Sequence, residues 1–178
     1  MSDETLQYPL GKYQPLDAPS AAQLEAFIDE IAEFPALLRK TLRGLSEEQL
    51  ETPYRQGGWT VRQLVHHIGD SHLNSLIRFK WALTEDNPTI KAYDQDLWAE
   101  TPDVGETPVA INLDFLEALH RKWVALLRSL APADWQRTFV HPVTGRQFTL
   151  HWLVGLYAWH GKHHTAHIQR LKEREGWG

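Results

Sequence analysis

Hydrophobic positions recur every three or four residues in four long segments of the chain, which is the spacing of one face of an α-helix. The first segment begins behind a capping box formed by Ser20 and Gln23, and it contains Pro35, which predicts a kink. Thr60 provides an N-cap for the second segment. The four predicted helices span about residues 21–44, 61–83, 108–130 and 150–175.

The connections between these segments differ in length and character. Residues 1–19 are rich in proline and predict an irregular arm laid over the surface, and residues 46–50 predict one short helical turn. Residues 85–107 form a long connection, and connections of this length inside a compact fold are often lids or crossovers. Residues 137–149 predict a short β-hairpin that turns at residues 142–145, directly before the last helix.

Four long helices with coiled-coil-like seams and one long crossover predict an all-α fold, a four-helix bundle. The chain has 178 residues, which is the length of one ordinary domain. We therefore expect a single domain over residues 1–178, with residues 1–19 as its N-terminal arm. The eight tryptophans predict a bulky aromatic interior or pocket lining.

Composition excludes several functional classes. The net charge is −5 and the basic residues form no long cluster, which argues against a nucleic-acid partner. No apolar run has the length of a membrane span, and the N-terminus lacks the pattern of a secretory signal, so we expect a cytoplasmic protein. The chain has no cysteine. Disulfides and thiolate ligands are therefore excluded, and a metal site would use imidazole, carboxylate or water.

The last predicted helix carries four histidines in the stretch WHGKHHTAHI. His160, His164 and His167 lie on its inward stripe, whereas His163 lies off it. A spacing of four stacks His160 above His164, so that both imidazoles can bind one ion. The residues between them include no glutamate, which excludes the zinc-metalloprotease helix with that spacing.

Histidines in an apolar seam need partners, because each unsatisfied buried polar group costs about 1–3 kcal/mol. This cost favours a metal site over the two other interpretations, a hydrated surface patch and a pH-sensitive core. A third ligand would come from another helix. The second helix offers His66, His67 and His72, of which His72 is the most inward, and the third helix offers His120. The helical pattern alone does not choose among them.

The combination of three stretches resembles a known family. GGWTVRQLVHHIGDSHLNSLIRFKWALTED, LHRKWVALLRSL and GLYAWHGKHHTAHI, together with YPLGKYQP and TPYRQGGW, are similar to the DinB/YfiT-like superfamily over nearly the whole chain. The resemblance implies a bundle with up-down-down-up helices. It also implies a metal-dependent hydrolase that acts on a small-molecule substrate, and a homodimer.

The same resemblance implies three metal ligands. The first is the histidine before an aliphatic residue and Gly/Ala-Asp, which here is His67, and the other two fall on His160 and His164. Relatives often carry a further histidine between positions 160 and 163, where this chain has Gly and Lys. That departure leaves the three ligand positions intact. His72 and His120 then become candidates for the pocket lining, for a fourth ligand or for core packing.

Three neutral imidazoles leave a divalent ion its full charge and an open position. Water bound there has a pKa of about 7, which supports hydrolysis. We expect one ion per subunit, zinc or nickel, because both suit an all-imidazole site. By resemblance to other family members, an alternative is a thiol S-transferase that uses a low-molecular-weight thiol. A non-catalytic metal-binding bundle is a further alternative.

Neighbouring residues have weaker assignments. Asp70, three residues after His67, is a candidate to orient that imidazole, and Asn74 lies on the same flank; a solvated helix face is the alternative for both. No carboxylate on the seams is a convincing general acid or base. Five aromatic residues are candidates for lining the cleft, with core packing as the alternative: Trp59, Tyr93, Trp98, Trp152 and Trp159.

Overall fold

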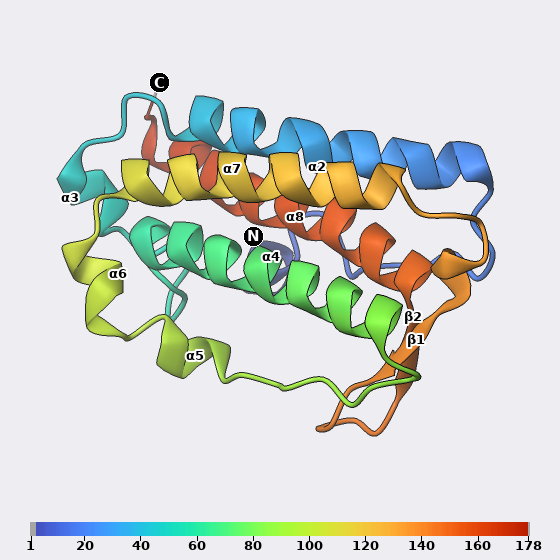
Figure 1. The fold of residues 1–178 in the computed structure, drawn as a ribbon. Coiled ribbons are helices and arrows are strands. Elements are labelled where there is room, and N and C mark those ends of the chain that lie inside the picture. The colour runs from blue at the N-terminus through green and yellow to red at the C-terminus, as the bar shows by residue number, and fades with distance from the viewer. Residues whose placement is uncertain (1–2, 178) are drawn as a thin grey trace.

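The computed structural model describes residues 3–177 and confirms the four-helix bundle. In Figure 1 the first and last long helices run in one direction and the two middle ones run in the other, which is the expected up-down-down-up order. The crossover between the two middle helices returns along the length of the bundle and makes their parallel arrangement possible. The four long helices are α2 (Ala21–Leu42), α4 (Val61–Thr84), α7 (Val109–Arg128) and α8 (Leu150–Glu175).

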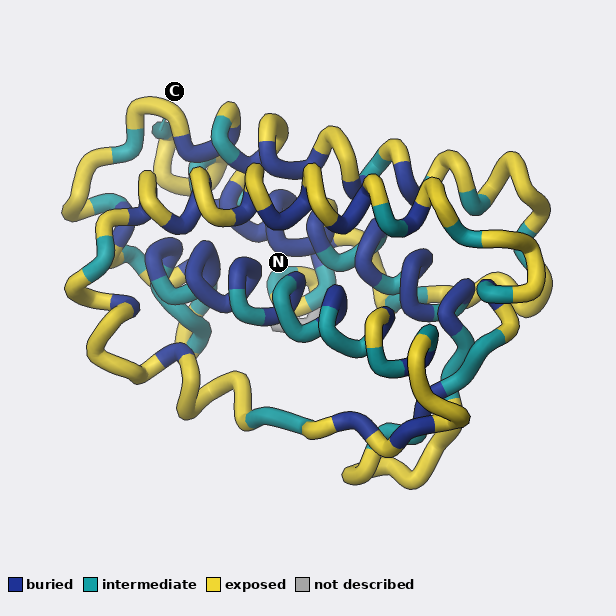
Figure 2. The backbone as a smooth tube through the Cα atoms, viewed as in Figure 1, coloured by how far each residue is buried: buried dark blue, intermediate teal, exposed yellow. Residues whose placement is uncertain are grey.

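Each long helix packs against two others, because α2 and α4 both contact α7 and α8. Figure 2 shows that the buried faces of the four helices point to a common interior. This interior holds two hydrophobic clusters, one that includes Phe79 and Trp123 and another that includes Leu64 and Leu116. On α8 the first cluster ends at Ala158 and the second begins at Ile168. The histidine-rich stretch therefore lies where the apolar core is interrupted.

The ends of the helices follow local sequence signals. Ser20 with Gln23 and Thr60 with Gln63 form complete capping boxes, so both predicted N-termini are confirmed. Helix α2 continues through Pro35 and ends at Leu42, slightly before the predicted end. Helix α8 ends at Gly176, which adopts the left-handed conformation that glycine accommodates at a C-cap.

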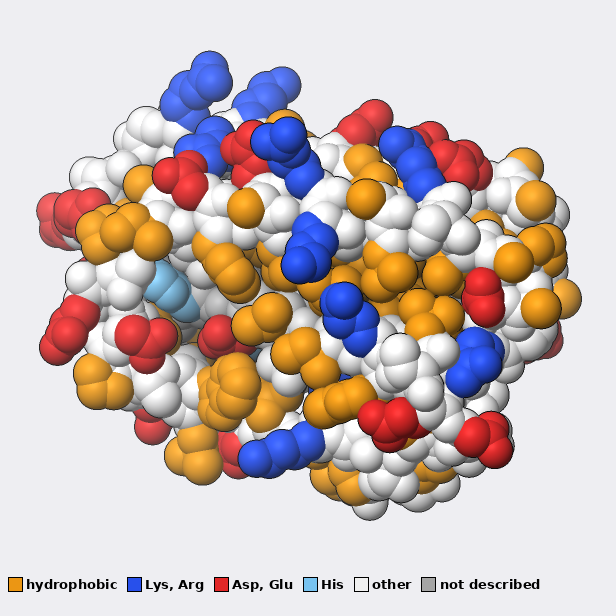
Figure 3. All heavy atoms as spheres, viewed as in Figure 1, with side chains coloured by type: hydrophobic (Ala, Val, Ile, Leu, Met, Phe, Trp, Pro, Cys, Tyr) orange, Lys and Arg blue, Asp and Glu red, His pale blue; other side chains and the backbone are white. Residues whose placement is uncertain are grey.

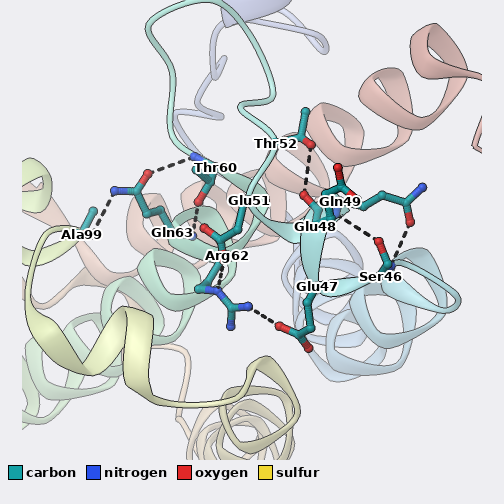
Figure 4. Close-up of polar contacts among 10 residues, drawn as sticks. All are labelled: Ser46, Glu47, Glu48, Gln49, Glu51, Thr52, Thr60, Arg62, Gln63 and Ala99. Carbon is teal, nitrogen blue, oxygen red and sulfur yellow. Dashed lines mark hydrogen bonds and ion pairs between the residues drawn. The ribbon is translucent and has the colours of Figure 1, made fainter.

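The segment between α2 and α4 is held by polar contacts, shown in Figure 4. The short helix α3 (Glu47–Leu50) confirms the predicted helical turn. Arg62 of α4 bonds the carboxylates of Glu47 and Glu51, and Gln63 donates its side-chain amide to the Ala99 carbonyl at 3.1 Å. These contacts join α3, α4 and the crossover at one end of the bundle.

Several short helices were not predicted. The expected irregular arm is wrong in part, because α1 (Asp3–Gln7) forms one helical turn before the chain becomes irregular up to residue 20. The crossover contains α5 (Gln95–Trp98) and α6 (Pro102–Glu106), and the 3₁₀ helix η1 (Asp134–Gln136) follows α7. Such short helices are too short to show a periodicity, and tertiary contacts rather than propensity stabilise them.

The hairpin before the last helix is confirmed. Strands β1 (Thr138–Val140) and β2 (Gln147–Thr149) pair antiparallel, with Phe139 opposite Phe148. The turn closes through the Gly145 amide, which donates to the His141 carbonyl at 2.8 Å.

Among residues 3–177, none of the helices combines the length and the apolar character needed to cross a membrane.

Candidate metal centre

Three histidines from two helices converge in the interrupted part of the core. His67 comes from α4, and His160 and His164 come from α8. One ring nitrogen of each lies within 4.8 Å of the other two. The Nε2 atoms of His160 and His164 are 3.1 Å apart, so the spacing of four brings these two side chains together as predicted.

These histidines face a cavity of about 560 Å³. The ring of Trp59, from the loop before α4, packs against the His67 imidazole with 4.5 Å between ring centroids. Tyr8, Tyr54 and Trp159 add further aromatic surface to the cavity wall. The rest of the wall is mainly polar, with five histidines, two glutamines, Arg55 and Asp96, so the pocket combines aromatic faces with many convergent polar groups.

The three imidazoles are held in the neutral form that metal binding requires. Burial lowers the pKa of His67 to about 4. Burial, followed by the neighbouring histidines, lowers the pKa values of His160 and His164 well below their ordinary range. All three side chains are therefore uncharged at neutral pH, with a lone pair available on each ring.

The donor set fits a divalent ion. Nitrogen ligands at 2.0–2.1 Å from a tetrahedral zinc ion lie about 3.3 Å from one another. The 3.1 Å between the His160 and His164 Nε2 atoms is close to that value. Imidazole is a ligand that suits both zinc and nickel.

His72 and His120 lie behind His160, outside the cavity wall. His72 is 0% exposed and His120 is 1% exposed, so the prediction that both point inward is confirmed. The His72 Nε2 atom lies 3.1 Å from Nδ1 of His160, the ring nitrogen on the other side from the one that faces His164. His72 therefore contacts the back of a candidate ligand.

A second histidine group overlaps the first. One nitrogen of each of His163, His164 and His167 also lies within 4.8 Å of the others, and all three residues are buried. His163 stacks on Trp159 with 4.3 Å between ring centroids, and His167 donates Nε2–H to the Gln7 carbonyl at 3.1 Å. Burial of these three histidines contradicts the alternative of a hydrated surface patch.

The structure does not bring Asp70 and Asn74 into the roles considered for them. Asn74 donates its side-chain amide to the main-chain carbonyl of Asp70 at 2.9 Å. The Asp70 carboxyl is half-buried, and burial followed by the charge of Asp103 raises its pKa to about 6.

Of the five aromatic candidates, Trp59 and Trp159 line the cavity. Tyr93 packs against Trp98, and Trp152 packs against Phe148, each pair with tilted rings.

Two charged residues of the cavity wall were not predicted. Asp96, on the short helix α5 of the crossover, is an exposed carboxylate at the cavity. Arg55, in the loop before α4, also lines the cavity, and its Nε atom is buried without a hydrogen-bond partner among the described residues. The one sequence signal that pointed to this part of the wall was the unusual length of the crossover, because connections this long often have a functional role.

The fold and the histidine group define a helical-bundle protein with a candidate metal centre in an aromatic cavity. The chain belongs to the DinB superfamily, whose family model matches residues 30–168.

Relatives of known sequence and structure agree with this assignment. Proteins of Bacillus mycoides (strain KBAB4) and Bacillus cereus (strain 03BB102), provisionally named metal-dependent hydrolases, are each 51% identical over 172 residues, covering 97% of this chain and 98% of theirs. The structure is similar to that of YfiT from Bacillus subtilis, described as a probable metal-dependent hydrolase with an unusual four-helix bundle topology. The TM-score is 0.96 at 45% identity, covering 98% of this chain and 99% of YfiT.

Proposed function

We propose that this protein is a hydrolase in which His67, His160 and His164 hold one divalent metal ion that activates water on a small-molecule substrate. The observation that carries the proposal is the convergence of three neutral imidazoles, two of them buried and one half-buried, at the wall of one cavity. The names of the relatives support the same class of reaction. When bound, such an ion lowers the pKa of water to about 7 and polarises a carbonyl or phosphoryl oxygen.

The residues of this chain have separate parts in this proposal. The three imidazoles bind the ion without neutralising its charge, since each is uncharged. Trp59 holds the His67 ring in place by packing against it. Tyr54 and Trp159 offer aromatic faces on which an apolar part of the substrate can pack. Arg55 offers a charged donor for an anionic or carbonyl group of the substrate.

Asp96 is the carboxylate that we assign to proton transfer. It lines the cavity from the side of the crossover, whereas the three histidines come from α4 and α8. A general acid or base has to lie within reach of the substrate, directly or through one water molecule. Asp96 meets this condition, because its side chain is exposed at the cavity.

The metal is zinc or nickel, with one ion per subunit, in a cytoplasmic homodimer. Figure 3 shows hydrophobic side chains gathered on the face formed by α7, α4 and the crossover. On α7, Ile111 is 56% exposed and Phe115 is 39% exposed, and on α5 Leu97 is 63% exposed. Exposed apolar patches of this kind favour association with another protein surface. Light scattering at several protein concentrations measures the mass and tests the dimer.

The experiment is a hydrolysis screen of small esters, amides and phosphoesters, run with metal-free protein and with protein reloaded with zinc or nickel. Turnover should require the metal and should be lost in the His67→Ala variant. The His151→Ala variant is the matched control, because His151 is buried on the same helix as two of the candidate ligands but does not line this cavity. It should keep most of the activity.

The melting temperature of the same variants separates a catalytic ion from a structural one. If the ion is catalytic, the His67→Ala variant should lose turnover and keep a cooperative fold. A structural ion predicts a large fall in the melting temperature on removal of metal from the parent, with no substrate turned over in the presence of metal. That second result would contradict the proposed hydrolase.

A further inference from the structure

Three hydrogen bonds connect a main-chain carbonyl of α2 to the candidate ligand His160. The His120 Nδ1 atom lies 2.6 Å from the Ile31 carbonyl oxygen. The His120 Nε2 atom lies 2.8 Å from His72 Nδ1, and the His72 Nε2 atom lies 3.1 Å from His160 Nδ1. The series crosses the bundle interior from α2 through α7 and α4 to α8.

The Ile31 carbonyl is free to join this series because of Pro35. In an α-helix the carbonyl of residue 31 accepts a hydrogen bond from the amide of residue 35. Residue 35 is a proline inside α2, and proline has no amide hydrogen. An unpaired carbonyl in a buried position costs about 1–3 kcal/mol. The His120 Nδ1–H group supplies the missing donor.

The direction of every bond in the series follows from this carbonyl. A carbonyl oxygen only accepts, so His120 Nδ1 carries the hydrogen. Burial lowers the pKa of His120 to about 4, so the ring is neutral and its Nε2 is an acceptor. His72 Nδ1 is then the donor to that atom. His72 is also neutral, because burial lowers its pKa well below the ordinary value, and its Nε2 accepts from His160 Nδ1.

We propose that Pro35, through the free Ile31 carbonyl, fixes the tautomers of His120, His72 and His160, so that the His160 Nε2 atom presents a lone pair to the metal site. Pro35, His120 and His72 are therefore positioning residues, and none of them is a ligand. The inference rests on the proposed metal site. It also assigns a function to the proline, which would otherwise destabilise the helix by about 3 kcal/mol.

The surroundings of the series hold the rings in this arrangement. The Phe34 ring stacks on His72 with 5.2 Å between centroids, and Trp123 contacts the edges of His72 and His120. These aromatic neighbours have no strong acceptor to compete for the ring hydrogens. A ring nitrogen that is hydrogen-bonded to a second residue orients the ligand and raises its basicity.

The first test reads the tautomers directly. Long-range ¹H–¹⁵N correlation spectra of uniformly ¹⁵N-labelled, metal-free protein distinguish Nδ1–H from Nε2–H for each imidazole, with assignments from single-histidine variants. The expected result is Nδ1–H for His120, His72 and His160. Nε2–H at any of these three would overturn the inference. This measurement needs no metal, so its outcome is independent of the proposed function.

The second test measures metal affinity by competition with a chelator of known affinity for Zn²⁺. The His120→Phe variant removes both hydrogen bonds of that ring and should weaken binding about 10- to 100-fold. The His120→Gln variant keeps a donor for Ile31 and an acceptor for His72, and it should recover most of the affinity.

The Pro35→Ala variant makes the sharpest comparison. It restores an amide that competes with His120 for the Ile31 carbonyl, while it removes an unfavourable residue from the helix. The expected result is unchanged or higher thermal stability together with weaker Zn²⁺ binding and a mixed tautomer at His120. Unchanged affinity and tautomers in this variant would overturn the role of Pro35. A parent protein that binds no metal would instead contradict the proposed function, with the tautomers still decided by the spectra.

Discussion

The ring of Phe34 on α2 lies directly over the backbone of Gly161 on α8. A Cβ atom at position 161 would come within 2.6 Å of the Phe34 ring, which is closer than such atoms approach in proteins. The absence of a side chain at position 161 lets this ring stack on His72, behind the candidate metal centre.

The Gly161→Ala variant should be destabilised. Alanine gains about 1 kcal/mol in helix propensity over glycine, but forcing a methyl group against a buried ring costs about 1–3 kcal/mol. Because the Phe34 ring also packs against His72 and His120, we expect a cost near the upper end of this range and a net loss of about 1–2 kcal/mol in the free energy of unfolding, measured by urea denaturation. Gly105→Ala is the control, since Gly105 is also helical but nothing lies within 4 Å of its Cβ position, so this variant should gain up to about 1 kcal/mol. Equal stability of the Gly161→Ala variant and the parent would contradict this packing.

The metal-free protein should lose stability as the pH falls from 7 to 5. Burial lowers the pKa values of His67 and His120 to about 4, whereas an unfolded chain has a histidine pKa of about 6.5. Between these values the unfolded state binds more protons, so each such histidine removes about 1.4 kcal/mol of stability per pH unit. Asp70 opposes this trend, because its raised pKa favours the folded state at low pH, but it is a single group.

Urea midpoints at pH 7, 6 and 5 measure this dependence. Zn²⁺ should increase the loss between pH 7 and pH 5, because it binds the neutral imidazoles and stabilises the folded state most at pH 7. A midpoint that stays constant over this range would show that the buried histidines are protonated in the folded protein.

The Asp96→Asn variant should separate catalysis from metal binding. Asparagine keeps the size of the side chain but neither accepts nor releases a proton at neutral pH. For a substrate found in the hydrolysis screen, we expect kcat to fall about 100-fold or more, the usual contribution of general acid–base catalysis. Metal content should stay at the parent level, since Asp96 is outside the candidate ligand group. Asp94→Asn, in the same segment, is the control, and full activity of the Asp96→Asn variant would contradict the assignment.

The long helices could be predicted from the sequence because their signals are local. The capping boxes at Ser20 and Thr60 and the apolar periodicity together define where α2 and α4 begin. The short helices α1, α5 and α6 are too short to show an apolar periodicity, although Asp94 caps α5 through the amides of Asp96 and Leu97. The position of Asp96 at the cavity depends on the path of the crossover, which no local signal encodes.

The candidate ligands show a different limit of sequence reasoning. The helical pattern favoured His72 over His67 as the more inward residue, and the structure confirms that His72 is the more deeply buried of the two. However, a helical wheel shows only whether a residue points inward, and not which neighbouring helix or cavity it meets. His67 lies on the side of α4 that faces the cavity, where the resemblance to the family had placed the ligand.

The most direct test of the central claim is the metal content of untagged protein purified without chelators, measured by mass spectrometry for the parent and single-histidine variants. We expect about one equivalent of zinc or nickel in the parent. The metal should be lost in the His67→Ala and His160→Ala variants and retained in the His163→Ala and His167→Ala variants, which disrupt only the overlapping group. The reverse pattern, or a parent that holds no metal even after reconstitution, would contradict the proposed metal centre.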